Sequence, residues 1–384
     1  MTTEFTPFKI NVPQSQLDDL KTRLERTIWP SEIEPQAWRQ GPTISYVQRL
    51  VHRWRTSFDW RAQESHLNHY PQFLTEIDGQ RVHFIHARAT EGKGKLALLL
   101  LHGWPGSIAE YVDVIQPLTN PHAAGIENND AFDVVIPSLP GYGFSGPTRQ
   151  AGWNDTRMAK AFLELMTRLG YERFGVQGGD AGAIIAPEIA RQAPNRVIGV
   201  HVHAATTGFI PLRPLTAEEM ASLGKSEKVR QERLQRYMRD WFGYNVIQSH
   251  RPQALSFALS DSPAGWLAWS TELFAGFGEK VGAIDDDVIL TNATIHWVAG
   301  TAASSIRHYY ENARDPNAWA PKTNSGVPTA VAIFQEADVP IRKFAEEANT
   351  IARWTEYEKG GHYPILEVPH VWAKGVREFF SNLH

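Results

Sequence analysis

The most informative absence in this sequence of 384 residues is cysteine, which occurs nowhere in the chain. Disulfides, thiolate nucleophiles and cysteine metal sites are therefore excluded. Because no thiol needs protection, a reducing and an oxidising compartment would suit the chain equally well.

A strong charge excess and a long apolar run are missing too. The formal net charge of -4 gives no support to a nucleic-acid partner, which would need a basic excess or patch. No apolar run approaches the roughly 18 residues of a membrane span. The N-terminal "MTTEFTPFKINVPQ" lacks the basic start and apolar core of a signal peptide. We therefore expect a soluble, cytoplasmic protein without a membrane anchor.

The remaining composition is that of an ordinary globular protein, with 42% hydrophobic and 21% charged residues. Aromatic residues are the exception, since 13 tryptophans occur and aromatics reach 11%. They indicate a broad aromatic surface, such as the lining of a pocket.

The first 92 residues are predicted to form an N-terminal extension. Leu17, Leu20 and Leu24 have the spacing of one helix face, and "TISYVQRLVHRWRTSFDWR" repeats that spacing. Two alternating runs, "QFLTEI" and "QRVHFIHARA", flank the pair Asp78 and Gly79, which predicts a β-hairpin.

From Lys95 the pattern becomes an alternation of strand, loop and helix. The run "KLALLLL" is short and almost continuously apolar, as expected for a strand buried on both faces of a parallel sheet. The runs "AFDVVIP", "RFGVQ", "RVIGVHVH" and "VPTAVAIFQ" repeat this strand pattern. Between the last two runs the chain is helical and polar-aromatic. The pattern predicts an α/β fold with a mostly parallel sheet, flanking helices and a helical lid insert.

The chain is accordingly divided into four segments. We expect the N-terminal extension, the first part of the core, the lid and the second part of the core at residues 1–92, 93–207, 208–322 and 323–384.

The stretch Phe174–Gly182, "FGVQGGDAG", joins a predicted strand to a predicted helix. Gly178, Asp180 and Gly182 fit the pattern Gly-x-nucleophile-x-Gly of the nucleophile elbow, in which small neighbours let the central side chain project from the sheet. The alternative interpretation is an aspartate that only caps the following helix.

Two further loops favour the catalytic interpretation. "LHGWPGS" follows a buried strand, so the backbone amides of Trp104 and Ala181 are predicted to form an oxyanion hole, with a structural role for His102. "EKGGHYP" places His362 after the last strand, the position of the general base in the order nucleophile, acid, histidine. His370 is expected to be structural.

The third member of the triad should be a carboxylate in "AIFQEADVPIRKFAEE". Asp338 and Glu336 compete for this role, and a shift of one or two residues changes completely where a side chain points.

A metal hydrolase is a rival class, because His83 and His86 could be mistaken for a ligand pair. Their odd separation in an alternating strand turns them to opposite faces. The acidic run Asp285–Asp287 is more simply read as the start of a helix. We expect neither a metal nor a cofactor.

The motifs "LHGWPGS", "GGDAG", "SDSPAG", "SSIRHYYE" and "EKGGHYPILEVP" together resemble the microsomal-type epoxide hydrolases with the α/β-hydrolase fold. The N-terminal segment is similar to that family's extension, a meander that wraps the core and lid. Without the membrane anchor of the vertebrate members, the chain resembles the bacterial and fungal ones. One departure is the loop "FQEAD", which carries an extra residue before the acid.

The resemblance implies further site residues. Two lid tyrosines that hydrogen-bond the epoxide oxygen fall on Tyr244 and Tyr309, with Tyr310 as an alternative for the second. For the acid the resemblance favours Asp338 over Glu336.

An aspartate nucleophile suits substitution at a saturated carbon, because a carboxylate is already ionised at pH 7. The predicted reaction is epoxide opening to an enzyme ester, followed by ester hydrolysis by a water that His362 activates. Tyrosines suit a basic alkoxide leaving group. The alternatives are a haloalkane or haloacid dehalogenase-like hydrolase with the same triad, and a non-catalytic ligand-binding relative.

The expected partners are an apolar small-molecule epoxide and water, with no nucleic acid. The pocket is predicted to be lined by the side chains of Trp104, Pro105, Trp241, Trp266 and Trp269. A homodimer is compatible with the sequence, which does not determine the oligomeric state.

Overall fold

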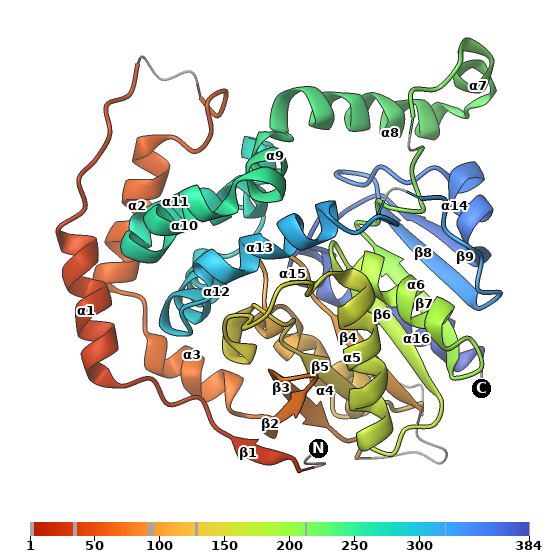
Figure 1. Ribbon diagram of the computed structural model, residues 1–384, viewed down its shortest axis with the longest axis horizontal. Helices are drawn as coiled ribbons and strands as arrows, with labels where there is room; N and C mark the ends of the chain where they lie inside the picture. The colour runs from red at the N-terminus through yellow and green to blue at the C-terminus, as the bar shows by residue number, and fades with distance from the viewer. Residues whose placement is uncertain are drawn as a thin grey trace.

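The computed structural model describes residues 4–33, 37–90, 96–126, 130–211, 213–318 and 320–383. Its centre is a nine-stranded sheet in the order β1-β2-β3-β5-β4-β6-β7-β8-β9 (Figure 1). The strands are β1 (Thr6–Phe8), β2 (Gln72–Ile77), β3 (Gln80–Ala87), β4 (Ala97–Leu101), β5 (Asp133–Pro137), β6 (Phe174–Gly179), β7 (Val197–His203), β8 (Pro328–Phe334) and β9 (Thr350–Tyr357).

The sheet is antiparallel at one edge and parallel elsewhere. β1, β2 and β3 pair antiparallel, as does β3 with β5, whereas every pair from β5 through β9 is parallel. The central strands β4, β5 and β6 are buried at every residue, in keeping with their mostly apolar sequences. The predicted α/β class with a mostly parallel sheet is confirmed, and so is the hairpin at Asp78 and Gly79. The short strand β1 was not predicted.

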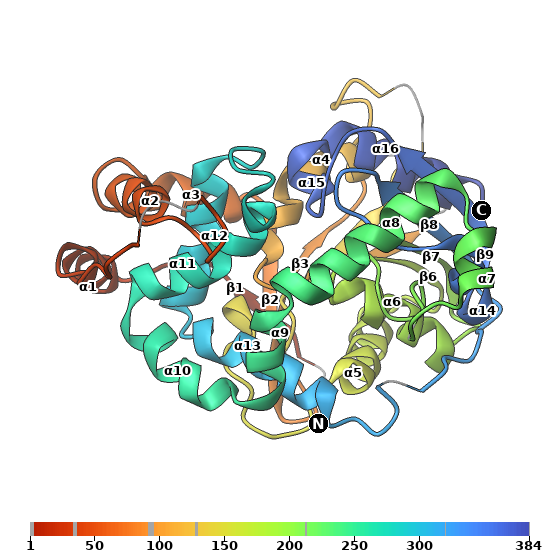
Figure 2. The same ribbon diagram turned by 90° about the horizontal axis from the view of Figure 1, so that it is seen from above.

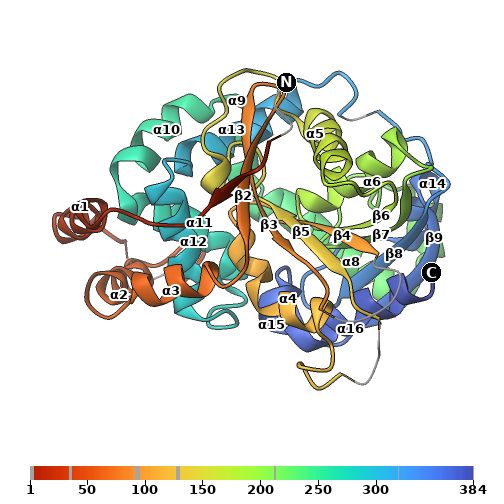
Figure 3. The same cartoon turned by 90° about the horizontal axis from the view of Figure 1, so that it is seen from below.

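Helices cover both faces of the sheet. In Figures 2 and 3, α5 (Asp155–Arg168) and α6 (Gly182–Gln192) lie on one side, and α4 (Val112–Thr119) and α16 (Pro369–Ser381) lie on the other. The remaining core helices are η1 (Ile108–Tyr111), η2 (Gly143–Ser145), α14 (Arg342–Ala348) and α15 (Pro364–Glu367).

Between β7 and β8 the described residues form helices and loops without a strand, as the sequence predicts for a lid. This lid lies across the upper edge of the sheet in Figure 1. Its helices are α7 (Ala217–Ser222), α8 (Lys225–Arg236), the π-helical η3 (Tyr237–Trp241), α9 (Gly243–His250), α10 (Pro252–Asp261), α11 (Pro263–Phe274), η4 (Gly276–Gly278), α12 (Asp286–Val298) and α13 (Ala302–Ala313). Asp285 caps α12 through its side chain, which confirms the predicted helix start.

The N-terminal extension contacts both the lid and the core sheet. Its helices α1 (Gln14–Glu25), α2 (Ile44–Thr56) and α3 (Trp60–Leu67) flank the outer side of the lid (Figure 2), while β1 to β3 extend the core sheet. The indole N–H of Trp54 donates to Thr294 Oγ1 in α12 at 2.9 Å, and Arg53 forms a two-bond ion pair with Asp287. The predicted boundary between residues 92 and 93 lies outside the described residues. Within the described parts of the chain, every helix is too short or too polar to traverse a lipid bilayer.

Candidate active site

The turn between β6 and α6 holds Asp180 in a conformation that the neighbouring backbone determines. Its φ of 53° lies in the left-handed region, which is strained for a residue with a side chain. The flanking glycines leave no room for a Cβ, which at Gly178 would lie 2.0 Å from the carbonyl oxygen of Gly182, and at Gly182 would lie 2.1 Å from that of Leu101. This is the steric pattern of a nucleophile elbow.

The Asp180 carboxylate is hydrogen-bonded through one oxygen. Its Oδ1 accepts from the backbone N–H of Trp104 at 3.0 Å and from that of Ala181 at 2.7 Å. These are the two amides expected for an oxyanion hole. The helix α6 begins without a side-chain cap, so the carboxylate does not take the role of a helix-capping aspartate.

The other carboxylate oxygen faces His362. Nε2 of His362 lies 3.3 Å from Asp180 Oδ2, and the two side chains expose 33% and 22% of their surface. Both therefore border space that water can reach. Burial by itself would lower the pKa of His362, but the Asp180 carboxylate, followed by Asp338, raises it above its ordinary value.

The contact between Asp180 and His362 also shifts the pKa of Asp180. Burial would raise its pKa, but His362, together with the amides of Trp104 and Ala181, lowers it below the ordinary value. Asp180 is therefore ionised at neutral pH.

The loop after β8 turns one of the two candidate acids inward. Asp338 is buried, and its Oδ2 accepts from the N–H of Phe334 at 2.7 Å. Burial raises the pKa of Asp338 to about 7, against the lowering effects of that N–H and of His362. Glu336 instead lies at the surface, where it pairs with Lys280.

The two predicted lid tyrosines meet at Trp104. The ring of Tyr244 stacks on Trp104 at 5.5 Å, and Tyr309 meets Trp104 edge-on at 5.9 Å. The two tyrosine rings are 6.1 Å apart. The alternative, Tyr310, packs against the Arg314 guanidinium at 3.3 Å.

Sequence reasoning missed Tyr237. Its hydroxyl is hydrogen-bonded to that of Tyr244 at 2.9 Å, and burial raises the pKa of both groups. The separation of seven residues, two helical turns, would have placed both on one face.

The predicted pocket tryptophans lie at different depths. Trp266 is buried and meets Trp104 edge-on at 6.4 Å. Trp269 donates to Gln248 at 2.8 Å, and Trp241 stacks on Phe277 at 5.0 Å. The Trp104–Pro105 peptide bond, in the loop whose Trp104 N–H binds Asp180, is cis.

His102, His83 and His86 make structural contacts. His102 bonds the carbonyl of Gly103 and accepts from the N–H of Leu139, and burial lowers its pKa to about 4. His83 bonds Ser138 and Gln72, whereas His86 bonds Tyr171, so the two do not share a ligand position. His370 is exposed.

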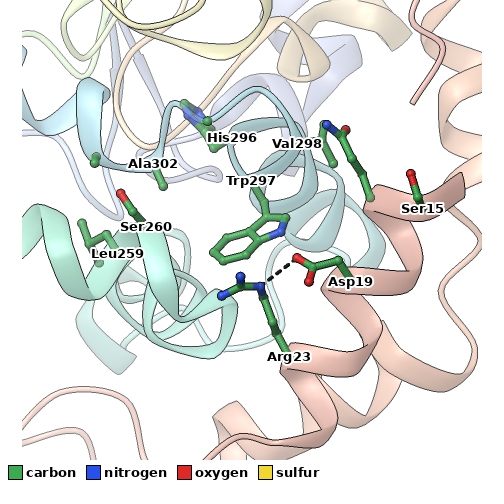
Figure 4. A pocket seen from close by; sticks show the side chains of 12 residues that line it. Ser15, Asp19, Arg23, Leu259, Ser260, His296, Trp297, Val298 and Ala302 are labelled. Carbon is green, nitrogen blue, oxygen red and sulfur yellow. Dashed lines mark hydrogen bonds and ion pairs between the residues drawn. The ribbon is translucent and has the colours of Figure 1, made fainter. Parts of the chain in front are cut away.

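A surface pocket of about 410 Å³ lies between α1 and the lid helices α10, α12 and α13 (Figure 4). Arg23 pairs there with Asp19 and Asp261 and lies over the ring of Trp297. None of the predicted catalytic residues lines this pocket. The pocket lies where the N-terminal extension packs against the lid.

The fold and the elbow define the chain as an α/β-hydrolase, and residues 97–252 match the family model "alpha/beta hydrolase fold". Residues 5–111 match "Epoxide hydrolase N terminus". A protein from Stigmatella aurantiaca named "Putative epoxide hydrolase" is 40% identical over 98% of this chain and 85% of its own length. Epoxide hydrolase 1 from Sus scrofa is 31% identical over 98% of this chain and 88% of its own length.

Two solved structures agree with this relationship. The crystal structure of juvenile hormone epoxide hydrolase from the silkworm Bombyx mori superposes with a TM-score of 0.89 at 26% identity, over 100% of this chain and 95% of that chain. The structure of Aspergillus niger epoxide hydrolase superposes with a TM-score of 0.85 at 28% identity, over 99% of this chain and 97% of that chain. The chain belongs to the epoxide hydrolase family, which confirms the resemblance inferred from its motifs.

Proposed function

We propose that this enzyme converts an apolar epoxide to a vicinal diol through a covalent ester on Asp180. The observation that carries the proposal is the arrangement of the Asp180 carboxylate, with Oδ1 bound by two backbone amides and Oδ2 3.3 Å from Nε2 of His362. A nucleophile, a base and an oxyanion site meet at one strained turn.

In the first step Oδ2 of Asp180 attacks a ring carbon of the epoxide, and the carbon–oxygen bond of the ring breaks. Oδ2 is the attacking atom because Oδ1 is held by the amides of Trp104 and Ala181. The oxygen that leaves the carbon is a basic alkoxide, to which Tyr244 and Tyr309 donate hydrogen bonds and one proton. Burial raises the pKa of both phenols, so they remain protonated until the ring opens.

In the second step His362 removes a proton from water, whose oxygen attacks Cγ of Asp180. Negative charge develops on Oδ1, where the N–H groups of Trp104 and Ala181 stabilise it. The intermediate then collapses as the Cγ–Oδ2 bond breaks, and the leaving diol oxygen takes the remaining proton of the attacking water. The proton on His362 returns to the tyrosinate, and Asp180 is free as a carboxylate. Asp338 stabilises the charged imidazole.

The charges favour this order of events. The Asp180 carboxylate raises the pKa of His362 in the free enzyme, but the ester carries no such charge. Ester formation therefore lowers the pKa of His362 and makes its neutral, basic form available for the second step.

A single turnover in oxygen-18 water tests the scheme. Because water attacks the enzyme carbonyl, the label should appear in the peptide that contains Asp180, and the first diol should be unlabelled. Mass spectrometry of peptide and product measures both. Label in the first diol would show direct attack of water on the epoxide and would overturn the proposal.

A further inference from the structure

Glu110 is a buried acid for which neither the fold nor the proposed reaction gives a use. It lies in η1 and is only 6% exposed. None of the described residues donates a hydrogen bond to its Oε1 atom or forms an ion pair with it. A buried carboxyl oxygen without a hydrogen-bond partner costs free energy, so a compensating role for Oε1 is expected.

The carboxyl of Glu110 lies against the loop that carries the oxyanion amide. A Cβ on Gly106 would be 1.4 Å from Oε1 of Glu110, so this carboxyl occupies the space that a side chain at position 106 would need. Three residues earlier, a Cβ on Gly103 would be 2.3 Å from Oδ1 of Asp180. Glu110 and Asp180 thus contact the same short loop.

The hydroxyl of Tyr363, in the loop before α15, is a second buried polar atom without a hydrogen-bond partner in the described part of the chain. Tyr363 is 5% exposed, and its hydroxyl has no hydrogen-bond partner among the described residues. It follows His362 directly, with ring centroids 4.7 Å apart. It also precedes α15, which contacts η1. In Figures 2 and 3, α15 lies beside α4, the helix that continues η1.

The charge states suit a shared hydrogen-bonding role. Burial, followed by the charge of Asp180, raises the pKa of Glu110 well above its ordinary value, against the lowering effect of the Ser107 N–H. Burial raises the pKa of Tyr363 as well. Both shifts favour the neutral forms, and each neutral group can donate and accept a hydrogen bond.

We propose that Glu110 and Tyr363 position the water that attacks the Asp180 ester. The water donates one hydrogen to Nε2 of His362 and the other to the carbonyl oxygen of Glu110, and it accepts from the Tyr363 hydroxyl. One lone pair then remains for Cγ of Asp180, which matches the hydrogen-bonding capacity of a buried water. His362 Nε2 makes no aligned hydrogen bond to a described residue, so it is available for this contact.

The inference rests on the proposed two-step function and concerns its second step only. Removing these contacts should slow ester hydrolysis and leave ester formation nearly unchanged, because Asp180 attacks the epoxide without help from the water. A group with a purely structural role would affect both steps together.

Rapid-quench measurements on an apolar aryl epoxide, with mass analysis of the Asp180 peptide, separate the two rates. We expect Glu110→Leu to slow ester hydrolysis by about 10²-fold, to change ester formation by less than about threefold and to accumulate the ester. Glu110→Gln keeps a carbonyl acceptor, so it should restore most of the hydrolysis rate. Tyr363→Phe should slow hydrolysis by about tenfold, the loss of one neutral hydrogen bond.

Glu64→Gln is the matched control, since Glu64 is a buried glutamate of helix α3 in the extension, where it pairs with Arg61. It should change neither rate.

An Asp180 ester that forms and hydrolyses in Glu110→Leu at the wild-type rate, or equal slowing of both steps, would overturn this inference alone. Absence of any ester in the wild-type enzyme would overturn the proposed function itself. Should Glu110→Leu not fold, the double variant Glu110→Gln/Tyr363→Phe decides, because unchanged hydrolysis in it is incompatible with the proposed contacts.

Discussion

The elbow and the lid hold the side chains proposed for catalysis by different physical means. At the elbow, Asp180 is held by backbone contacts so close that Gly178 and Gly182 cannot carry a side chain. In the lid, Tyr244 and Tyr309 are held by ring packing around Trp104, a residue more than a hundred positions away in the chain.

The difference shows which part of a site tolerates change. Removing one group from a packed cluster of rings leaves the other contacts in place, whereas the proposed nucleophile on the strained turn has no substitute. Changes at the elbow should abolish the reaction, and changes in the lid should weaken it in steps.

The largest effect is expected from Asp180→Asn. The amide keeps the shape of the side chain but is a far weaker nucleophile, so turnover of an apolar epoxide should fall by about 10⁴-fold or more. Initial rates measure the loss, and an unchanged thermal midpoint controls for folding. A rate within tenfold of the wild type would remove Asp180 from the proposed role.

Substitutions of the two lid tyrosines should slow the reaction in smaller steps. Tyr244→Phe and Tyr309→Phe should each slow ester formation by about tenfold, because one tyrosine still donates to the alkoxide, and the double variant by about 10²–10³-fold. Ester hydrolysis should be unaffected, since the epoxide oxygen has already been protonated. Rapid-quench rates test this, and equal effects on both steps would mean that the tyrosines only support the lid.

The two steps should also differ in pH dependence. The pKa of Asp180 is lowered, so ester formation should persist as the pH falls from 8 toward about 5, above the ordinary aspartate range. Ester hydrolysis needs neutral His362 and should fall by about tenfold per pH unit below the pKa of that residue in the ester. Single-turnover rates across this range measure both, and parallel profiles would contradict the division of roles.

The sequence predicted the elbow better than the lid for the same physical reason. Gly178, Asp180 and Gly182 are adjacent in the chain, and the sterics that bring them together act over five residues. Tyr237 was missed because the seven-residue spacing from Tyr244 indicates only a shared helix face, and the hydroxyl contact between the π-helical η3 and α9 depends on how the two rings are turned. Asp338 and Glu336 could not be separated because a loop, unlike a strand, does not determine which side chain turns inward.

The smallest effect is expected where the extension supports the lid. Thr294→Val keeps the shape of the side chain but leaves the indole N–H of Trp54 buried without its acceptor, which should lower the free energy of unfolding by about 1–3 kcal/mol. Thermal or denaturant unfolding measures the loss. Well below the melting temperature, ester hydrolysis at the elbow should be unchanged, and only the tyrosine-dependent step should slow, by less than about threefold.

A double-mutant cycle with Trp54→Phe makes this last prediction decisive. Phenylalanine removes the N–H donor, so Thr294→Val should cost less stability in the Trp54→Phe background than in the wild type, because no donor is then left unpaired. Equal costs in both backgrounds would mean that the bond does not couple α2 to α12. The position of the lid tyrosines would then depend on the lid helices and the core alone.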